Sequence, residues 1–283
     1  CWTDFFKRFG DEMRAAQESG APVDMHDVMQ KVDYEKMGEI RDFIGSVIDD
    51  PKVAETAKPW YNFLCKRPLY SDDFIQSYNR PNVSLVDTDG RGVEEITAKG
   101  LIVNGEEIEL DAIIFATGFD VGAEPHKVGE YELLGHDGIT LDQKWADGVH
   151  SVHGTQMAGF PNLHIVGAAA QGITAFNFTH VLEIQSDHAV AQIANCLNKD
   201  ILSAEVTAEA EEKWNDMMVQ HHVDRTHFYE ECTPGFLNNE GEFRERPTFI
   251  GGSFGSGPLV YEQIIEEWRN NEFEQDTNRV MAE

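Results

Sequence analysis

The sequence predicts an α/β fold with a helical amino-terminal piece, and two short apolar runs carry the sheet part of that prediction. Ala112–Ala116 is unbroken and contains two adjacent β-branched residues, and it stops at Thr117-Gly118. Leu163–Val166 follows a Pro-Asn turn and stops at Gly167. Such runs are typical of strands buried on both faces of a parallel sheet. We therefore expect two buried parallel strands, each ending at a glycine turn. The alternative for each is an ordinary core strand before a turn.

The helical piece is predicted for residues 1–62. A loop with Gly20 and Pro22 divides it, and Asp50-Pro51 begins a further short helix because proline suits the first helical turn. Apolar residues recur at helical spacing in two stretches, which are Phe5, Phe6, Phe9 and Met13, and then Met37, Ile40, Ile44 and Ile48. A generic helical hairpin explains this pattern equally well.

Residues 63–110 have a sequence pattern that indicates short β-strands. We expect a strand at Val83–Val86 and a β-meander formed by Glu94–Thr97 and Gly100–Val103. Asn104-Gly105 lies between Leu101–Val103 and Ile108–Leu110, which is the pattern of a hairpin with a type I′ turn.

The remaining chain is predicted to be irregular over residues 121–160 and mostly helical afterwards. Thr207 is a candidate N-cap for one helix, a strand is expected at Thr248–Ile250, and another helix should run through Trp268. A helix from Thr179 should place one apolar stripe toward the core, made of Leu182, Ala189, Ile193 and Leu197.

Composition excludes some classes of function. The chain has 283 residues and a formal net charge of −29, which argues against nucleic-acid or anionic-membrane partners. It contains no apolar run of membrane-spanning length and no signal pattern. Cys1, Cys65, Cys196 and Cys232 lack CxxC spacing, which favours a reducing, cytoplasmic compartment and no zinc site. Because the chain begins with cysteine, we expect a fragment or a processed product.

Four motifs together resemble one family. Ala116-Thr-Gly-Phe-Asp120 is followed by Phe160-Pro-Asn-Leu-His-Ile-Val-Gly167 and a long helix, and is preceded by Cys65-Lys-Arg-Pro-Leu-Tyr70 and Tyr78-Asn-Arg-Pro-Asn-Val83. This combination resembles the carboxyl-terminal half of the Baeyer–Villiger (class B flavin-dependent) monooxygenases. The resemblance implies a fragment of a flavoprotein with two Rossmann-like dinucleotide-binding domains. Residues 1–62 would be a helical insertion of the NADP domain, 63–118 the rest of that domain, and 119–283 the end of the FAD domain with a carboxyl-terminal extension.

The resemblance also implies an activity. The parent would be an FAD- and NADPH-dependent monooxygenase that inserts one oxygen atom of O2 into a small carbonyl substrate, giving an ester or lactone. The alternatives are a relative that oxidises nitrogen or sulfur, and a non-catalytic binding module derived from a flavoprotein. The G-x-G-x-x-G motifs of the family are absent, so this chain alone should bind FAD weakly and be inactive. The substrate and the oligomeric state cannot be read from the sequence.

Lys66-Arg67 is the candidate catalytic pair. Two adjacent cations in an acidic chain suggest an anion site, with arginine as a rigid fork and lysine as a point charge suited to phosphate. The resemblance implies that Arg67 stabilises the negatively charged peroxyflavin and that Lys66 contacts the extra phosphate of NADPH. The alternative is a solvent-exposed basic pair.

Backbone and cap positions are the candidate cofactor contacts. A bare backbone at the end of a buried strand suits a dinucleotide, which applies to Thr117, Gly118 and Gly167. The resemblance implies that the following helix directs its positive amino end at the flavin. Its candidate contacts are Gln171, Gly172, Asn177 and Thr179, and capping alone is the alternative for Asn177 and Thr179.

Two further features look functional and are discounted. Gly251–Gly257 lies between a predicted strand and a helix but lacks the dinucleotide register. Metal-capable side chains cluster loosely near the carboxyl end, and their spacing fits no standard site, so surface histidines are expected for His221, His222 and His227 near Cys232.

Overall fold

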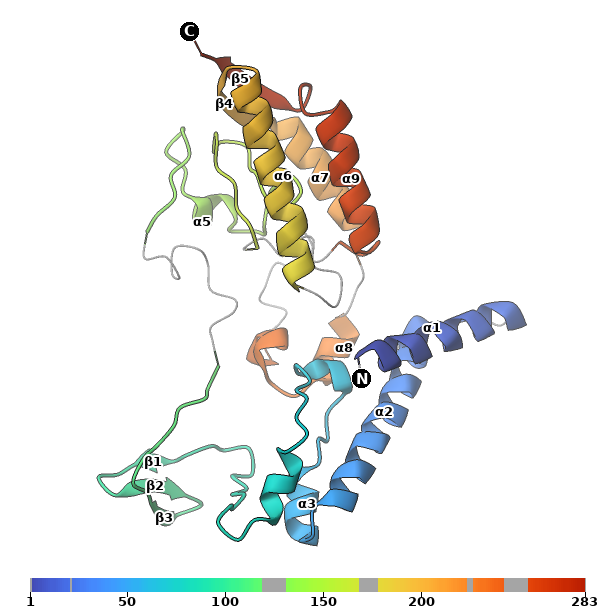
Figure 1. Ribbon diagram of the computed structural model, residues 1–283, viewed down its shortest axis with the longest axis vertical. Helices are drawn as coiled ribbons and strands as arrows, with labels where there is room; N and C mark the ends of the chain where they lie inside the picture. The colour runs from blue at the N-terminus through green and yellow to red at the C-terminus, as the bar shows by residue number, and fades with distance from the viewer. Residues whose placement is uncertain are drawn as a thin grey trace. The chain divides into compact units, whose positions relative to one another are not determined.

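The computed structural model describes residues 2–20, 22–118, 131–167, 178–222, 226–241 and 254–282. The chain forms two compact units, which Figure 1 draws in the order of the sequence from blue to red. Unit 1 comprises Cys1–Val121 and Phe228–Gly241, and unit 2 comprises Gly122–His227 and Glu242–Glu283.

Unit 1 begins with the predicted helices, which are α1 (Trp2–Ser19), α2 (Met25–Val47) and α3 (Pro51–Ala57). Side-chain caps set the starts of α2 and α3: the Asp24 carboxylate accepts from His26 N at 2.8 Å, and the Asp50 carboxylate accepts from Lys52 N at 2.8 Å. Apolar residues at the expected spacing are buried, including Phe5, Met37, Ile44 and Ile48. The helical prediction is therefore confirmed.

The predicted hairpin is confirmed as part of a small antiparallel sheet. Its strands are β1 (Glu95–Ile96), β2 (Gly100–Val103) and β3 (Glu106–Glu109), in the order β1-β2-β3. Asn104 (φ 52°) and Gly105 (φ 76°) both take the left-handed conformation that a type I′ turn requires. Val83–Val86 forms no strand, so that prediction is wrong.

The predicted strand at Ala112–Ala116 is also wrong. The segment has no regular structure, and Ile114 and Phe115 are 90% and 70% exposed. A parallel strand exists only through hydrogen bonds to neighbouring strands, and both sheets of the described residues contain only antiparallel pairs. The apolar run therefore has no sheet within this part of the chain to join.

A disulfide joins distant parts of unit 1. Cys65 closes the short helix η1 (Phe63–Cys65), and its sulfur is bonded to that of Cys232, 167 residues away, with a Cα–Cα distance of 5.3 Å. Cys232 lies between α8 (Thr226–Glu231) and η4 (Phe236–Gly241), and η2 (Ile75–Asn79) is the remaining short helix. The cysteine pattern did not predict this pairing, because it joins residues that are distant in the sequence.

Unit 2 is built on three helices and a two-stranded sheet. Ile184, Trp214, Met218, Tyr261 and Ile265 share one buried cluster, which joins the three helices. The helices are α6 (Phe178–Asn198), α7 (Ala208–Gln220) and α9 (Pro258–Asn271), and the antiparallel strands are β4 (Ile201–Val206) and β5 (Thr277–Met281) (Figure 1). The predicted cap of α7 and the helix through Trp268 are confirmed.

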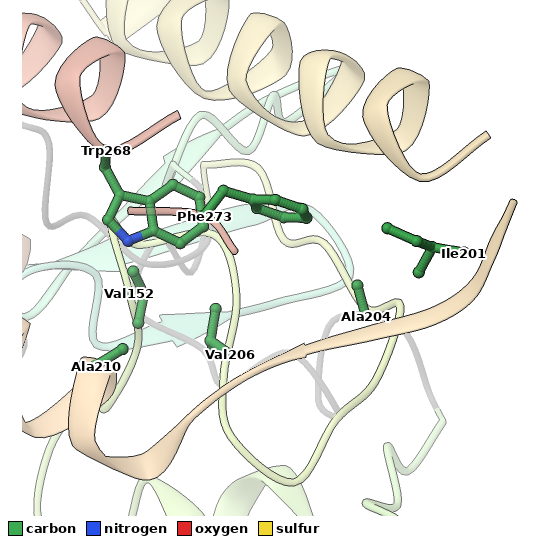
Figure 2. Close-up of a cluster of buried hydrophobic side chains, with 7 residues drawn as sticks. All are labelled: Val152, Ile201, Ala204, Val206, Ala210, Trp268 and Phe273. Carbon is green, nitrogen blue, oxygen red and sulfur yellow. The ribbon is translucent and has the colours of Figure 1, made fainter. Parts of the chain in front are cut away.

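A second apolar cluster packs against β4. Figure 2 shows Trp268 and Phe273 beside Val152 and Val206, and the two aromatic rings meet edge to face with centroids 5.6 Å apart. The Trp268 indole donates to Asp276 at 2.8 Å, so its one polar group is satisfied inside the cluster. This cluster anchors the carboxyl end of α9 and the strand pair.

Within residues 131–167 the chain forms a short helix, α5 (Leu141–Lys144), which sequence patterns did not predict. A capping box formed by Thr140 and Gln143 starts it. Lys144 then pairs with the buried Glu211 of α7 at 2.7 Å, which ties this otherwise irregular stretch to the helices.

The predicted strand at Leu163–Val166 is wrong as well, because the segment has no ladder and is half-buried. It is held instead by single bonds: Ile165 N donates to Thr155 O at 2.8 Å, and Asn162 accepts from Ala204 N of β4 at 3.0 Å. The predicted glycine turn at its end is confirmed, since Gly167 has φ 82°.

Among the helices that the structure describes, none combines the length and apolarity that a membrane crossing requires.

Candidate functional site

The turn that carries Lys66 and Arg67 is anchored from two sides in unit 1. Asp33 of α2 is buried and accepts from Phe63 N at 2.6 Å, which fixes the start of η1. The disulfide of Cys65 fixes its end. Burial raises the pKa of Asp33 to about 6, although the bond from Phe63 opposes this shift. The two cations therefore follow directly after a rigid attachment.

The backbone at Lys66 is extended (φ −133°, ψ 160°), and successive side chains on extended backbone alternate in direction. Lys66 Nζ donates to Pro234 O at 2.7 Å and lies 5.6 Å from the centroid of the Tyr61 ring. No carboxylate among the described residues pairs with Lys66. Arg67 is exposed. The Pro234 carbonyl and the Tyr61 ring carry no negative charge, so neither neutralises the Lys66 ammonium group.

Thr117 and Gly118, the first candidate backbone contacts, are exposed in unit 1. Gly118 has φ 92°, and an added Cβ would meet nothing within 4 Å. Its backbone is therefore accessible on the side that a Cβ would occupy, and only glycine adopts this conformation without strain.

Gly167, the candidate in unit 2, is closely packed. A Cβ at this position would lie 2.6 Å from Leu182 Cδ2 and 3.3 Å from Phe178 Cζ, both in the first turns of α6. Gly167 N donates to the side-chain Oε1 of Gln185 at 2.9 Å. The φ of 82° therefore favours glycine, and a larger residue would also displace the tips of the Leu182 and Phe178 side chains.

A buried polar network extends from that bond. Gln185 Nε2 donates to Tyr261 Oη at 3.3 Å, and Tyr261 donates to the carbonyl of His153. His153 Nδ1 lies 3.2 Å from His188 Nε2, which also lies 2.7 Å from Gln192 Nε2. All five side chains are at least 97% buried.

This network was missed because it occupies the face of α6 that the sequence assigned differently. Ala189 of the predicted stripe is buried, but Ile193 and Leu197 are 46% and 73% exposed. The buried stripe is Val181, Ile184, Gln185, His188, Ala189 and Gln192. The helical spacing of Gln185, His188 and Gln192 was visible in the sequence, but polar residues at such spacing normally mark the solvent face.

The two histidines of the network are neutral packing groups. Burial lowers the pKa of His153 to about 3 and holds that of His188 well below its usual value. The His153 ring centroid lies 4.7 Å from that of Trp214 and 5.1 Å from that of Trp268. Neither histidine can serve as a base near neutral pH in contact with solvent.

The remaining candidates divide between described and undescribed parts of the chain. Thr179 is exposed in the first turn of α6. Gln171, Gly172 and Asn177 lie outside the described residues, as do the predicted strand at Thr248–Ile250 and residues 251–253 of the discounted glycine-rich stretch. Of the discounted metal-capable groups, Cys232 is in the disulfide and His221 bonds to Ser256.

The chain was compared with known proteins by sequence and by structure. No family model matches it. It is 34% identical to a Baeyer–Villiger monooxygenase of Stachybotrys chlorohalonatus over 271 residues, which is 95% of this chain and 43% of the relative. It is 38% identical to pentalenolactone D synthase of Streptomyces exfoliatus over 88% of this chain and 43% of that enzyme. The chain is a relative of the Baeyer–Villiger monooxygenases.

Solved Baeyer–Villiger structures agree with that relationship. The polycyclic ketone monooxygenase of Thermothelomyces thermophila superposes with a TM-score of 0.81 at 32% identity, covering 89% of this chain and 41% of that one. Cyclohexanone monooxygenase of Rhodococcus sp. Phi1 bound to NADP+ gives 0.72 at 26% identity, covering 89% and 46%. The chain thus spans less than half the length of these relatives. The predicted resemblance to the Baeyer–Villiger monooxygenases and the α/β fold class are confirmed.

Proposed function

We propose that this chain is the carboxyl-terminal part of an FAD- and NADPH-dependent monooxygenase that inserts one oxygen atom of O2 into a ketone, giving an ester or lactone. The observation that carries the proposal is the match to the polycyclic ketone monooxygenase, with a TM-score of 0.81 over 89% of this chain. The names of the relatives above favour ketone oxidation over oxidation of nitrogen or sulfur, and over a binding module without activity.

The domain assignment follows from the same proposal. Residues 1–62 would belong to a helical insertion of the NADP domain and residues 63–118 to the rest of that domain. Residues 119–283 would end the FAD domain and extend beyond it. The chain contains no G-x-G-x-x-G stretch, the usual cradle for a dinucleotide pyrophosphate. We therefore expect this chain alone to bind FAD weakly and to be inactive.

Several residues fit the part of the cofactors that this chain would hold. Gly118 and Gly167 have left-handed φ. The Cβ side of Gly118 is open to a cofactor, whereas Leu182 and Phe178 cover the Cβ side of Gly167, so Gly167 would contact a cofactor through its other face. Thr117 and Thr179 would add hydroxyl groups beside these turns, and Gln171, Gly172 and Asn177 are further candidates outside the described residues. When bound, NADPH supplies a hydride and FAD supplies the activation of O2.

Lys66 would bind the extra phosphate that distinguishes NADPH from NADH. Its ammonium group donates to Pro234 O at 2.7 Å and has no ion pair among the described residues, so no carboxylate there competes with a phosphate for it. A phosphate oxygen can accept from the same ammonium without displacing the Pro234 carbonyl, because lysine has three donors.

Arg67 would stabilise negative charge on the reacting oxygen atoms. Its guanidinium is a planar fork of hydrogen-bond donors, and it follows an anchored turn rather than a free loop. A fixed cation aimed at developing charge is worth roughly 3 kcal/mol in a site that excludes water. Arg67 is therefore the residue that we propose as catalytic.

The decisive experiment uses the whole monooxygenase, supplied with NADPH, O2 and a panel of cyclic ketones, amines and thioethers. We expect FAD to copurify and ketones to give esters or lactones, as detected by mass spectrometry. Oxidation of the amines or thioethers with the ketones left unchanged would favour the nitrogen- or sulfur-oxidising alternative. A whole protein without flavin and without product would favour the binding module.

A further inference from the structure

Gln185 is a fully buried amide whose two ends make specific bonds. It lies on α6 with no exposed surface. Its Oε1 accepts from Gly167 N at 2.9 Å, and its Nε2 donates to Tyr261 Oη of α9 at 3.3 Å. A buried amide that lacked these partners would destabilise the fold, so both bonds are needed for the side chain to remain inside.

The acceptor end of Gln185 holds a backbone that no strand ladder restrains in the described residues. Gly167 follows a segment without a strand ladder, and Val166 beside it is 40% exposed. Glycine has the largest choice of conformations, so a left-handed φ of 82° is not selected by the residue itself. The bond from Gly167 N to Gln185 supplies that selection, and Leu182 and Phe178 close the other side of the turn.

The donor end makes Gln185 rigid. Tyr261 has no exposed surface and donates to the carbonyl of His153, so its oxygen presents a lone pair toward Gln185. Burial raises the pKa of Tyr261, which keeps the hydroxyl protonated and able to donate. Gln185 is therefore fixed between α9 and the turn.

We infer that Gln185 is a positioning residue, which sets the backbone of Gly167 in the conformation that receives the flavin. The inference rests on the proposed function, in which Gly167 contacts FAD. It goes beyond that function because it assigns cofactor affinity to a side chain that has no accessible surface of its own.

A purely structural role for Gln185 is the competing explanation, and Gln192 provides a matched control. Gln192 lies two turns further along α6, is also almost fully buried, and also bonds inside the network, to His188 at 2.7 Å. Its side chain makes no bond to Gly167. Gln185→Met and Gln192→Met therefore each remove one buried amide from the same core, and only the first removes the bond to Gly167.

The test compares these variants in the whole monooxygenase by three measurements: thermal unfolding, amide hydrogen exchange at Gly167, and the dissociation constant of FAD. Both variants should unfold at lower temperatures. We expect Gln185→Met to weaken FAD binding and to speed the exchange of Gly167 by about tenfold each, the loss of one hydrogen bond. Gln192→Met should leave both within about twofold of the parent.

A third variant tests rescue. A protonated glutamic acid has the same shape as glutamine and can accept from Gly167 and donate to Tyr261. Burial raises the pKa of such a group, so Gln185→Glu should recover FAD affinity at about pH 6 and lose it as the pH rises.

The outcomes distinguish a failure of the positioning role of Gln185 from a failure of the proposed monooxygenase function. Equal loss of FAD affinity in Gln185→Met and Gln192→Met would overturn the positioning role, as would faster exchange at Gly167 with unchanged affinity. A parent protein that holds no FAD would overturn the proposed function and the inference with it. In that case the exchange rate of Gly167 still decides whether Gln185 sets the turn.

Discussion

Replacing Gly167 with alanine tests whether this turn is limited by space as well as by conformation. An alanine in the left-handed region costs roughly 1–2 kcal/mol. The new Cβ would also lie 2.6 Å from Leu182 Cδ2, so the leucine tip must leave its rotamer. That movement costs about 0.5–1.5 kcal/mol. The expected loss in the free energy of unfolding is therefore about 1.5–3.5 kcal/mol, the sum of the two effects.

Gly138 provides a control that separates the two effects. It also lies in unit 2 and has φ 77°, close to the 82° of Gly167, but an added Cβ would meet nothing within 4 Å. Gly138→Ala should therefore cost only the conformational part, about 1–2 kcal/mol. The difference between the two variants measures the packing of Gly167 against α6.

Urea unfolding followed by tryptophan fluorescence is a suitable assay, because Trp214 and Trp268 are buried in unit 2. The double variant Gly167→Ala with Leu182→Ala should recover the steric part relative to Leu182→Ala alone, because the clash is then absent. Equal losses for Gly167→Ala and Gly138→Ala would refute the reasoning, since Leu182 would then play no part.

Four further predictions concern the cations, the disulfide and the buried histidines. In the whole monooxygenase, Arg67→Ala should leave flavin reduction by NADPH largely intact and lower product formation on the order of a hundredfold or more, and Arg67→Lys should rescue it poorly. Stopped-flow reduction and product analysis test this prediction. Ester formation by Arg67→Ala near the parent rate would contradict it. Lys66→Ala should raise KM for NADPH but not for NADH, as steady-state kinetics with both cofactors would show; equal changes would exclude the phosphate contact. Reduction of the Cys65–Cys232 disulfide, which closes a span of 167 residues, should lower the free energy of unfolding by about 2–4 kcal/mol, and Cys232→Ser should abolish this dependence on a dithiol reductant. The pKa of His153 is lowered to about 3 in the folded protein, whereas a histidine in the unfolded chain has a pKa near 6.5. The free energy of unfolding should therefore fall as the pH drops from about 6.5 toward 3, by up to about 1.4 kcal/mol per pH unit. His153→Gln should flatten that slope in acid unfolding curves.

The sequence by itself determined the elements whose free energy is local. Asp24 and Asp50 cap α2 and α3 through bonds to residues two positions away, and Asn104-Gly105 folds its own hairpin. Such bonds form between neighbours in the chain, so the pattern of residues is sufficient to predict them. The family was also readable, because its motifs are runs of particular residues rather than arrangements in space.

Only the tertiary structure decided which surfaces are buried. Ala112–Ala116 has the pattern of a core strand but is exposed, because a parallel strand depends on partners that this part of the chain does not supply. Gln185 has the pattern of a solvent-facing residue but is buried, because Gly167 and Tyr261 satisfy both ends of its amide. Cys65 and Cys232 meet across 167 residues. In each case the deciding free energy comes from groups that are distant in sequence, and no local pattern records them.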